Sequence, residues 1–303
     1  MGKFYTEKEK QFITKNYPNF GAKYCALKLN RTPIAIIGWC AKNNIRISKD
    51  RLLEKQRKNI KKAHEKSRNK SYDKFNINPE YFLNPKTKEA AYILGLIWAD
   101  GYVRNEGVGL NNSINIAMCS EDLDTLLPIF DKSGKWGKYR LSLPNRKIQT
   151  KLITQNRVIV EFLIKNNYGN KSGGSPHSII RHIPEHLINY WFLGLVDGDG
   201  CFYYNHECNQ FSIVSTYDQD WQFMIDLFDK LGVKKYSIKK RKQIKSNADI
   251  HKSSIIRISN IDDIVTFGDF IYQNYESDKI GLARKYDKFK LIKSKQLKRI
   301  ANI

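Results

Sequence analysis

One phrase occurs twice in this chain of 303 residues. The first copy reads AAYILGLIWADGYV from residue 90, and the second reads NYWFLGLVDGDGCFY from residue 189. Each copy is apolar on nearly every side and ends in Asp-Gly, a pattern typical of a helix that is buried all round. We therefore predict two buried helices, over 88–99 and 187–198, in two copies of one structural unit.

Glycine and alanine define one face of each predicted helix. They recur four residues apart, at Ala91, Gly95 and Ala99 in the first helix and at Gly194 and Gly198 in the second. Residues at this spacing share a helix face, so two such faces allow close backbone contact. We predict that the two helices pack against each other there. Gly101 and Gly200 follow the helix ends, where we expect left-handed C-caps.

The segments that follow each phrase also correspond. INIAMCSEDLDTLLPIFDKSG at 114–134 matches FSIVSTYDQDWQFMIDLFDKLG at 211–232, as a short strand, a turn and an amphipathic helix. Each half therefore predicts helix, two strands, helix, two strands and helix. The expected fold class is α+β, with two pseudo-symmetric αββαββα halves at 80–186 and 187–303.

Parallel helices in close contact end side by side, which places Asp100 and Asp199 together at two negative helix ends. Two carboxylates in one place raise a pKa or require a cation. Mg²⁺ prefers oxygen ligands and shares its coordination shell with water and substrate phosphates. The pair therefore predicts a metal site for phosphodiester cleavage, with Mn²⁺ able to substitute.

The charge of the chain indicates an anionic partner. The chain has 53 Lys and Arg residues against 30 Asp and Glu, for a net charge of +23. Residues 1–75 alone hold 20 of the basic residues and 6 of the acidic ones. A surplus of this size favours nucleic acid. A membrane span is not expected, because the longest apolar run has ten residues and a spanning helix needs about 20. Binding to a membrane surface is not expected either, because the sequence shows no basic amphipathic helix with an apolar face. The polar, charged N-terminus predicts a protein that is not secreted.

ILGLIWADG at 93–101 and FLGLVDGDG at 192–200 resemble the LAGLIDADG signature of homing endonucleases, in the single-chain form with two motifs. The resemblance covers about residues 80–290. It implies a metal site formed by Asp100, Asp199, Ala99 and Gly198, in which the two aspartates hold the catalytic metals. It also implies a catalytic lysine near each motif, assigned to Lys171 and Lys279. Trp98 departs from the signature, at a position that does not bind metal.

The resemblance further implies a monomer that cleaves a long, pseudo-palindromic duplex DNA. An intron maturase or a regulator that binds nucleic acid without cleaving it remains the alternative. An intein endonuclease is disfavoured, because the chain lacks the terminal Cys or Ser and His-Asn that splicing needs. The expected location is the cytoplasm of a bacterial or phage-infected cell, or an organelle matrix.

Two strand pairs carry alternating basic and amide side chains that suit base edges and phosphates in the major groove. They lie within 137–152 and 234–252. The expected DNA contacts are Arg140, Arg146, Lys147, Gln149, Lys151, Lys239, Arg241 and Gln243. An ordinary solvated sheet face is the alternative for each of them.

Residues 1–47 predict a three-helix domain before these halves, joined to them by a basic linker at 48–79. Thr6 and Glu9 form a predicted capping box, and Thr32 and Pro33 open the third helix. We expect Ile34, Ile37 and either Cys40 or Ala41 to face inward. The segment resembles a Myb-like or resolvase-like helix-turn-helix, which implies DNA contacts at Arg31, Thr32, Trp39 and Lys42. A structural or RNA-contacting cap is the alternative.

Overall fold

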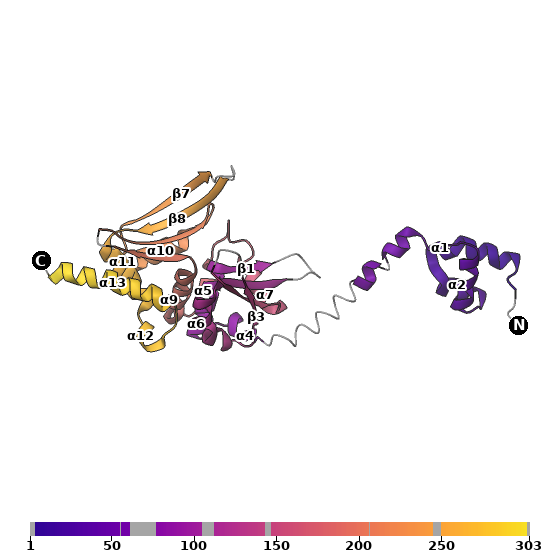
Figure 1. Cartoon of the computed structure of the whole chain (residues 1–303), viewed down its shortest axis with the longest axis horizontal. Helices are drawn as coiled ribbons and strands as arrows, with labels where there is room; N and C mark the ends of the chain where they lie inside the picture. Colours follow the sequence, from indigo (N-terminus) through magenta and orange to yellow (C-terminus); the bar gives the residue numbers. More distant parts are fainter. Residues whose placement is uncertain are drawn as a thin grey trace. The chain divides into compact units, whose positions relative to one another are not determined.

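The computed structural model describes residues 4–54, 56–60, 77–104, 112–142, 147–205, 207–244 and 250–301. The chain separates into two compact units, Met1–Lys70 and Ser71–Ile303. Figure 1 shows the elements of each unit.

The N-terminal unit is helical. Helix α1, Glu7–Leu29, starts at the predicted capping box, in which Glu9 N donates to Thr6 Oγ1 at 3.3 Å and Thr6 N donates to Glu9 Oε2 at 2.7 Å. The helix is broken at Gly21, whose φ of 73° only glycine adopts readily. Asn30 ends α1 in the left-handed conformation, and α2, Pro33–Lys42, follows with Thr32 as its N-cap. Residues 49–54 and 56–60 are also helical.

A small core holds these helices together, and it corrects one prediction. Its buried side chains are Ile13, Tyr17, Cys25, Ala26, Ile36 and Cys40. Ile34 and Ile37 were expected to face inward, but they are 81% and 49% exposed. Helix α2 instead turns Ile36 inward, together with Cys40, which was one of the residues expected there, and this i, i+4 pair occupies the buried face.

The larger unit contains two halves with the predicted order of elements. The first half comprises α5 (Lys88–Asp100), β1 (Gly101–Arg104), β2 (Ser113–Cys119), α6 (Ser120–Asp131), β3 (Gly137–Leu141), β4 (Gln149–Thr154) and α7 (Arg157–Lys165). The second comprises α9 (Ile188–Asp199), β5 (Gly200–Tyr204), β6 (Asn209–Thr216), α10 (Gln222–Leu231), β7 (Tyr236–Ile244), β8 (Ile250–Ile258) and α11 (Ile261–Tyr272). The predicted α+β class with two αββαββα halves is confirmed.

Each half folds its strands into one antiparallel sheet. The strand orders are β1-β2-β4-β3 and β5-β6-β8-β7, so the two sheets have the same topology. Short helices complete the unit: α4 (Glu80–Leu83), α8 (His177–Ile180), the 3₁₀ helix η1 (Glu185–Leu187) and α12 (Tyr275–Asp278). The long helix α13, Ala283–Ala301, follows α12 and packs against α11 and β5.

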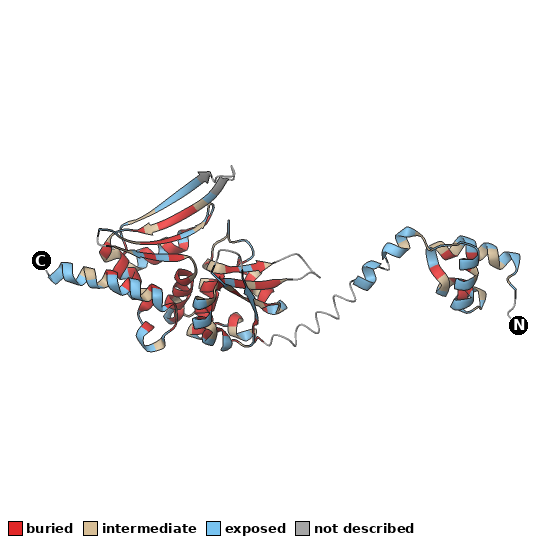
Figure 2. Ribbon diagram, in the orientation of Figure 1, coloured by how far each residue is buried: buried red, intermediate tan, exposed pale blue. Residues whose placement is uncertain are grey.

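Helices α5 and α9 lie side by side at the centre of the unit, and most of their residues are buried (Figure 2). A Cβ added to Gly95 would lie 1.9 Å from the carbonyl oxygen of Trp191, and one added to Gly194 would lie 2.1 Å from that of Tyr92. Both distances are far below a van der Waals contact, so only glycine fits at the crossing. The predicted packing through glycine faces is confirmed.

The glycines after the two helices differ from the prediction. Gly101 and Gly200 have φ of −77° and −82°, so neither forms a left-handed cap. They open strands β1 and β5 instead. A Cβ would lie 2.4 Å from the Ile97 carbonyl oxygen at Gly101 and 2.7 Å from the Val196 carbonyl oxygen at Gly200. Close approach to the preceding helix turn, and not a positive φ, is the reason for glycine at these positions.

Candidate active site

Asp100 and Asp199 are the last residues of α5 and α9, and the helix crossing brings these ends together. A Cβ added to Gly198 would lie 2.3 Å from the Ala99 Cβ and 3.3 Å from Asp100 Oδ2. The carboxylate of Asp100 therefore lies against the last turn of α9, one residue before Asp199. The structure thus brings together the four residues expected at a metal site.

Burial shifts the pKa values of both acids upward. Burial, followed by the negative charge of Asp100, raises the pKa of Asp199 to about 7. Burial also raises the pKa of Asp100, while the positive charges of Lys285 and Lys171 oppose this shift. Two partly buried carboxylates with raised pKa values mark a site where negative charge is under-compensated, as functional sites often are.

Lys171 lies at the end of the first motif helix, as predicted. Its Nζ donates to the carbonyl oxygens of Trp98 at 2.8 Å, Gly101 at 2.5 Å and Ala99 at 3.2 Å. Burial lowers its pKa to about 8, and the charges of Asp199 and Asp100 oppose that shift. The ammonium group therefore satisfies carbonyl groups left unpaired at the helix end and places positive charge beside both acids.

Lys279, the residue expected to match Lys171 in the second half, does not reach the motif. It is exposed, it ends α12 in the left-handed conformation, and its Nζ pairs with Glu276. The structure therefore contradicts its placement at the site. Lys279 ends the short helix α12, before α13 begins, and its position in the sequence alone could not show that it does not contact the motif.

Lys285 on α13 occupies the corresponding position. Its buried Nζ donates to the carbonyl oxygens of Val196, Asp197 and Gly200, each at 2.7 Å. In the repeated phrase, these three residues correspond to Ile97, Trp98 and Gly101, all of which accept from Lys171 Nζ.

A sequence signal for Lys285 existed. It shares the inward face of α13 with Phe289 and Ile292, so it is a lysine on the apolar stripe of an amphipathic helix.

Asp197, which replaces the first half's Trp98, is a buried structural acid. Its Oδ2 accepts from the Tyr92 hydroxyl and from the Leu282 N–H, both at 2.8 Å. Burial raises its pKa to about 6. Tyr92 belongs to α5 and Asp197 to α9, so this hydrogen bond joins the two halves. No pattern in the sequence predicted this contact.

A second link between the halves lies close to Asp100. Arg284 at the start of α13 makes a two-pronged contact with Asp122 of α6, with Nε to Oδ1 at 2.7 Å and Nη2 to Oδ2 at 2.6 Å. This pairing lowers the pKa of Asp122. Planar Arg–carboxylate contacts fix geometry as well as charge, so the pair helps set the position of α13, which carries Lys285.

The donor set suits a hard divalent cation. Within the described ranges, no cluster of three or more His, Cys, Asp or Glu forms a closed metal site. The chain supplies two carboxylates at the helix ends, which is what Mg²⁺ takes when water and phosphate complete its shell. Asp100 and Asp199 would hold the ion. Ala99 belongs to the same helix end, but its carbonyl oxygen already accepts from Lys171.

The sheet register separates the expected DNA contacts into two groups. In β4, Thr150 and Leu152 are buried toward the helices, which places Gln149 and Lys151 on the open face. Arg140 pairs across the ladder with Thr150, so it lies on the helix side, where it contacts Asp124 at 3.5 Å. The expectation that Arg140 lies on the open face is wrong.

The second sheet follows the same rule. Lys239 pairs with Ile255 and Arg241 with Ser253, on the face opposite the buried Ile256, and both side chains are exposed. Gln243 lies on the same strand, two residues after Arg241, but its side chain is outside the described part of the structure. Lys147 is exposed and contacts Glu121 at 3.1 Å. Arg146 lies outside the described residues.

In the N-terminal unit, three of the four expected DNA contacts have structural partners. Arg31 contacts Glu9 at 3.1 Å and lies over the Tyr5 ring. The Thr32 side chain caps α2 by accepting from Ala35 N at 3.3 Å. Trp39 is half-buried and packs against the small core. Lys42 is exposed at the end of α2.

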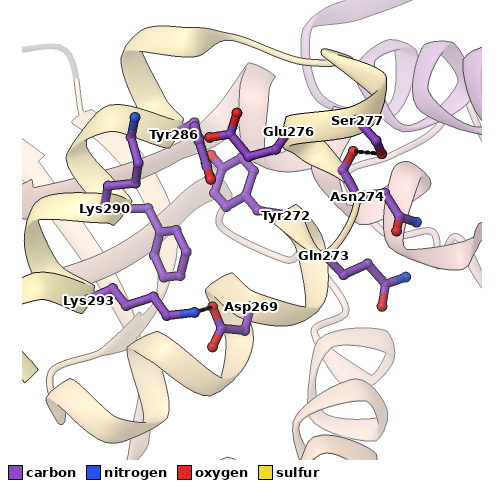
Figure 3. Close-up of a pocket in the computed structure, with 10 residues that line it drawn as sticks. Asp269, Tyr272, Gln273, Asn274, Glu276, Ser277, Tyr286, Lys290 and Lys293 are labelled. Carbon is purple, nitrogen blue, oxygen red and sulfur yellow. Dashed lines mark hydrogen bonds and ion pairs between the residues drawn. The ribbon is translucent and has the colours of Figure 1, made fainter. Parts of the chain in front are cut away.

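A cavity in the second half is separate from these residues. It has a volume of about 450 Å³ and lies among α11, α12 and α13, where Lys293 pairs with Asp269 and Tyr286 lies near Glu276 (Figure 3). Neither Asp100 nor Asp199 lines it, so it is not part of the candidate active site. No helix within the described ranges is both long enough and apolar enough to span a bilayer.

Comparison with known proteins gives structural likenesses only. No family profile matches the chain, and no curated protein matches it. The structure is similar to the homing endonuclease I-WcaI bound to its DNA recognition sequence, with 15% identity, a TM-score of 0.41, and coverage of 69% of this chain and 91% of the other. It is also similar to the LAGLIDADG meganuclease I-AabMI bound to uncleaved DNA, with 14% identity, a TM-score of 0.40, and coverage of 72% of this chain and 90% of the other.

The N-terminal LAGLIDADG domain of DUF199/WhiA is also similar, with 15% identity, a TM-score of 0.37, and coverage of 71% of this chain and 93% of the other.

Proposed function

We propose that this chain is a site-specific, metal-dependent endonuclease of duplex DNA, of the LAGLIDADG type. One observation carries the proposal. The glycine-mediated crossing of α5 and α9 brings two acids, one from each half, to a single place between the half-buried Lys171 and the buried Lys285. A protein with a net charge of +23 and such a site suits a phosphodiester substrate.

Each side chain has a separate role in this proposal. Asp100 and Asp199 would hold divalent metal, which supplies an activated water and stabilises the leaving oxygen. Lys171 and Lys285 hold the two helix ends through their carbonyl hydrogen bonds and place positive charge beside the scissile phosphates. The cross-half contacts of Tyr92 with Asp197 and of Arg284 with Asp122 keep the two acids in register.

The two sheets provide the proposed DNA surface. Gln149 and Lys151 in the first half, and Lys239 and Arg241 in the second, lie on the sheet faces opposite the helices. Polar and basic side chains on such a face suit phosphates and base edges. Because the halves differ in sequence, the target is a long duplex with imperfect two-fold symmetry, bound by a monomer. Residues 1–47 form a second DNA-binding domain in this proposal.

Cleavage of a random duplex library in plasmids tests the function. We expect the purified chain to linearise a small fraction of plasmids in Mg²⁺ or Mn²⁺ and none in EDTA, with the cut sites sharing one sequence. Asp100→Asn and Asp199→Asn should abolish cleavage and retain binding to the selected sequence. Cleavage by either variant at the wild-type rate would refute the assignment. Selection of one sequence without cleavage would favour the regulator or maturase alternative.

A further inference from the structure

The outward face of α2 is apolar and uncovered. Ile34 and Ile37 are 81% and 49% exposed, and Ala35, Gly38 and Ala41 beside them are also exposed. An exposed helix normally shows solvent a charged or polar face. Of the four side chains predicted to contact DNA here, Lys42 is exposed. The other three have structural partners: Arg31 contacts Glu9, Thr32 caps the helix and Trp39 packs on the core.

The shape of this face suits close approach of another surface. Nothing lies within 4 Å of a Cβ added to Gly38, and Ala35 and Ala41 add little bulk. Ile34, Ile37 and Ala41 fall at i, i+3 and i+7, so they form one stripe along the helix. A helix of this width enters the DNA major groove, where the 5-methyl group of thymine is the apolar feature.

Charge identifies the occupant as a polyanion. Residues 10–49, which contain α2 and both of its flanks, hold eight Lys and Arg and no acid. Among the acids described on either side of this range, Glu7 pairs with Lys10, Glu9 with Arg31 and Glu54 with Lys58, and Asp50 is exposed. An apolar stripe in a basic surface matches a groove lined by methyl groups between phosphates.

We propose that α2 reads A·T base pairs in the major groove through contacts of Ile34 and Ile37 with thymine methyl groups. This rests on the proposed DNA-binding function of the chain and adds the residues and the base that they select. Arg31, Thr32 and Trp39 position the helix, and the surrounding lysines and arginines bind phosphates without reading sequence.

Uracil substitution tests the proposal, because deoxyuridine differs from thymidine at this edge only by the absent methyl group. The full chain is used in EDTA to select a binding sequence from a random duplex library. The Kd is then measured for the selected duplex and for duplexes with single T-to-U changes at each A·T pair. We expect at least one A·T position where uracil weakens wild-type binding about four-fold per lost methyl contact.

The double variant I34A/I37A should bind the thymine duplex more weakly and should not distinguish thymine from uracil at those positions. Because both side chains are exposed and alanine favours helix formation, the thermal unfolding of the double variant should match that of the wild type. Ile60→Ala is the matched control, because Ile60 is an isoleucine 56% exposed in the same unit. It should keep the thymine preference.

Equal binding of thymine and uracil duplexes by the wild type at every position would overturn the proposal, as would a thymine preference that persists in I34A/I37A. Self-association that I34A/I37A abolishes while its thymine preference remains would assign the face to a second copy of the chain. Because no metal is present, these outcomes do not depend on whether Asp100 and Asp199 support cleavage.

Discussion

Substitution of Gly95 by alanine tests the helix crossing on which the site depends. The added Cβ would lie 1.9 Å from the Trp191 carbonyl oxygen and 3.1 Å from the Leu195 nitrogen. These are backbone atoms, so no side-chain rotation relieves the contact. Helices α5 and α9 would have to separate by about 1.5 Å to restore ordinary packing.

The expected loss of stability follows from two opposing contributions. Overpacking of a close-packed core costs about 3 kcal/mol at the upper end of its usual range, and the helix propensity of alanine returns about 1 kcal/mol. The free energy of unfolding should therefore fall by about 2 kcal/mol or more. For a unit of this size, this corresponds to a decrease in Tm of about 4–8 °C.

Calorimetry and urea denaturation measure this loss, and Gly173→Ala is the matched control. A Cβ at Gly173 meets nothing within 4 Å, so this variant should stay within about 0.5 kcal/mol of the wild type. Gly194→Ala should behave like Gly95→Ala, because its Cβ would lie 2.1 Å from the Tyr92 carbonyl oxygen. A Gly95→Ala protein as stable as Gly173→Ala would show that the helices do not cross as described.

Three further predictions concern the site. The pKa of Asp199 is raised from 3.8 to about 7, so in EDTA the folded state keeps a proton between about pH 4 and pH 7 that the unfolded state has lost. The free energy of unfolding of the wild type should therefore fall as pH rises through this range, and Asp199→Asn should be more stable than the wild type at pH 8. Urea denaturation at several pH values measures both effects. A free energy of unfolding that falls more steeply with pH for the variant than for the wild type would contradict this. Lys285→Met should abolish cleavage and lower Tm, because three carbonyl groups lose their hydrogen-bond donor. Lys279→Met should change neither cleavage nor Tm, because Lys279 is exposed and pairs with Glu276. The reverse result would assign Lys279, and not Lys285, to the site. Tyr92→Phe should cost about 1–3 kcal/mol in calorimetry because it leaves buried Asp197 with one fewer donor, and a neutral effect would show that this hydrogen bond does not link the halves.

The repeated phrase predicted the architecture because burial leaves a strong pattern. Helices apolar on all sides, small residues at Gly95 and Gly194, and a matching order of elements in each half all follow from local sequence. The close approach at the crossing could be inferred because glycine in a buried helix needs a reason.

Features that depend on register or on distant packing could not be predicted in this way. The face of Arg140 is set by its pairing with Thr150, and a shift of one residue would reverse it. Lys285 reaches the site only because α12 and the start of α13 bring it back to the second motif helix. The rotation of α2 depends on which of Ile34, Ile36 and Ile37 packs best, and three isoleucines within four residues leave that choice open to tertiary contacts.

Binding of Mn²⁺ most directly tests the claim that Asp100 and Asp199 share a divalent cation. Free Mn²⁺ is measured by electron paramagnetic resonance during titration of the full chain at pH 8, above the raised pKa of Asp199. The wild type should remove Mn²⁺ from solution in a saturable manner, and the double variant D100N/D199N should lose that uptake while remaining folded. Equal uptake by the two proteins would contradict the claim.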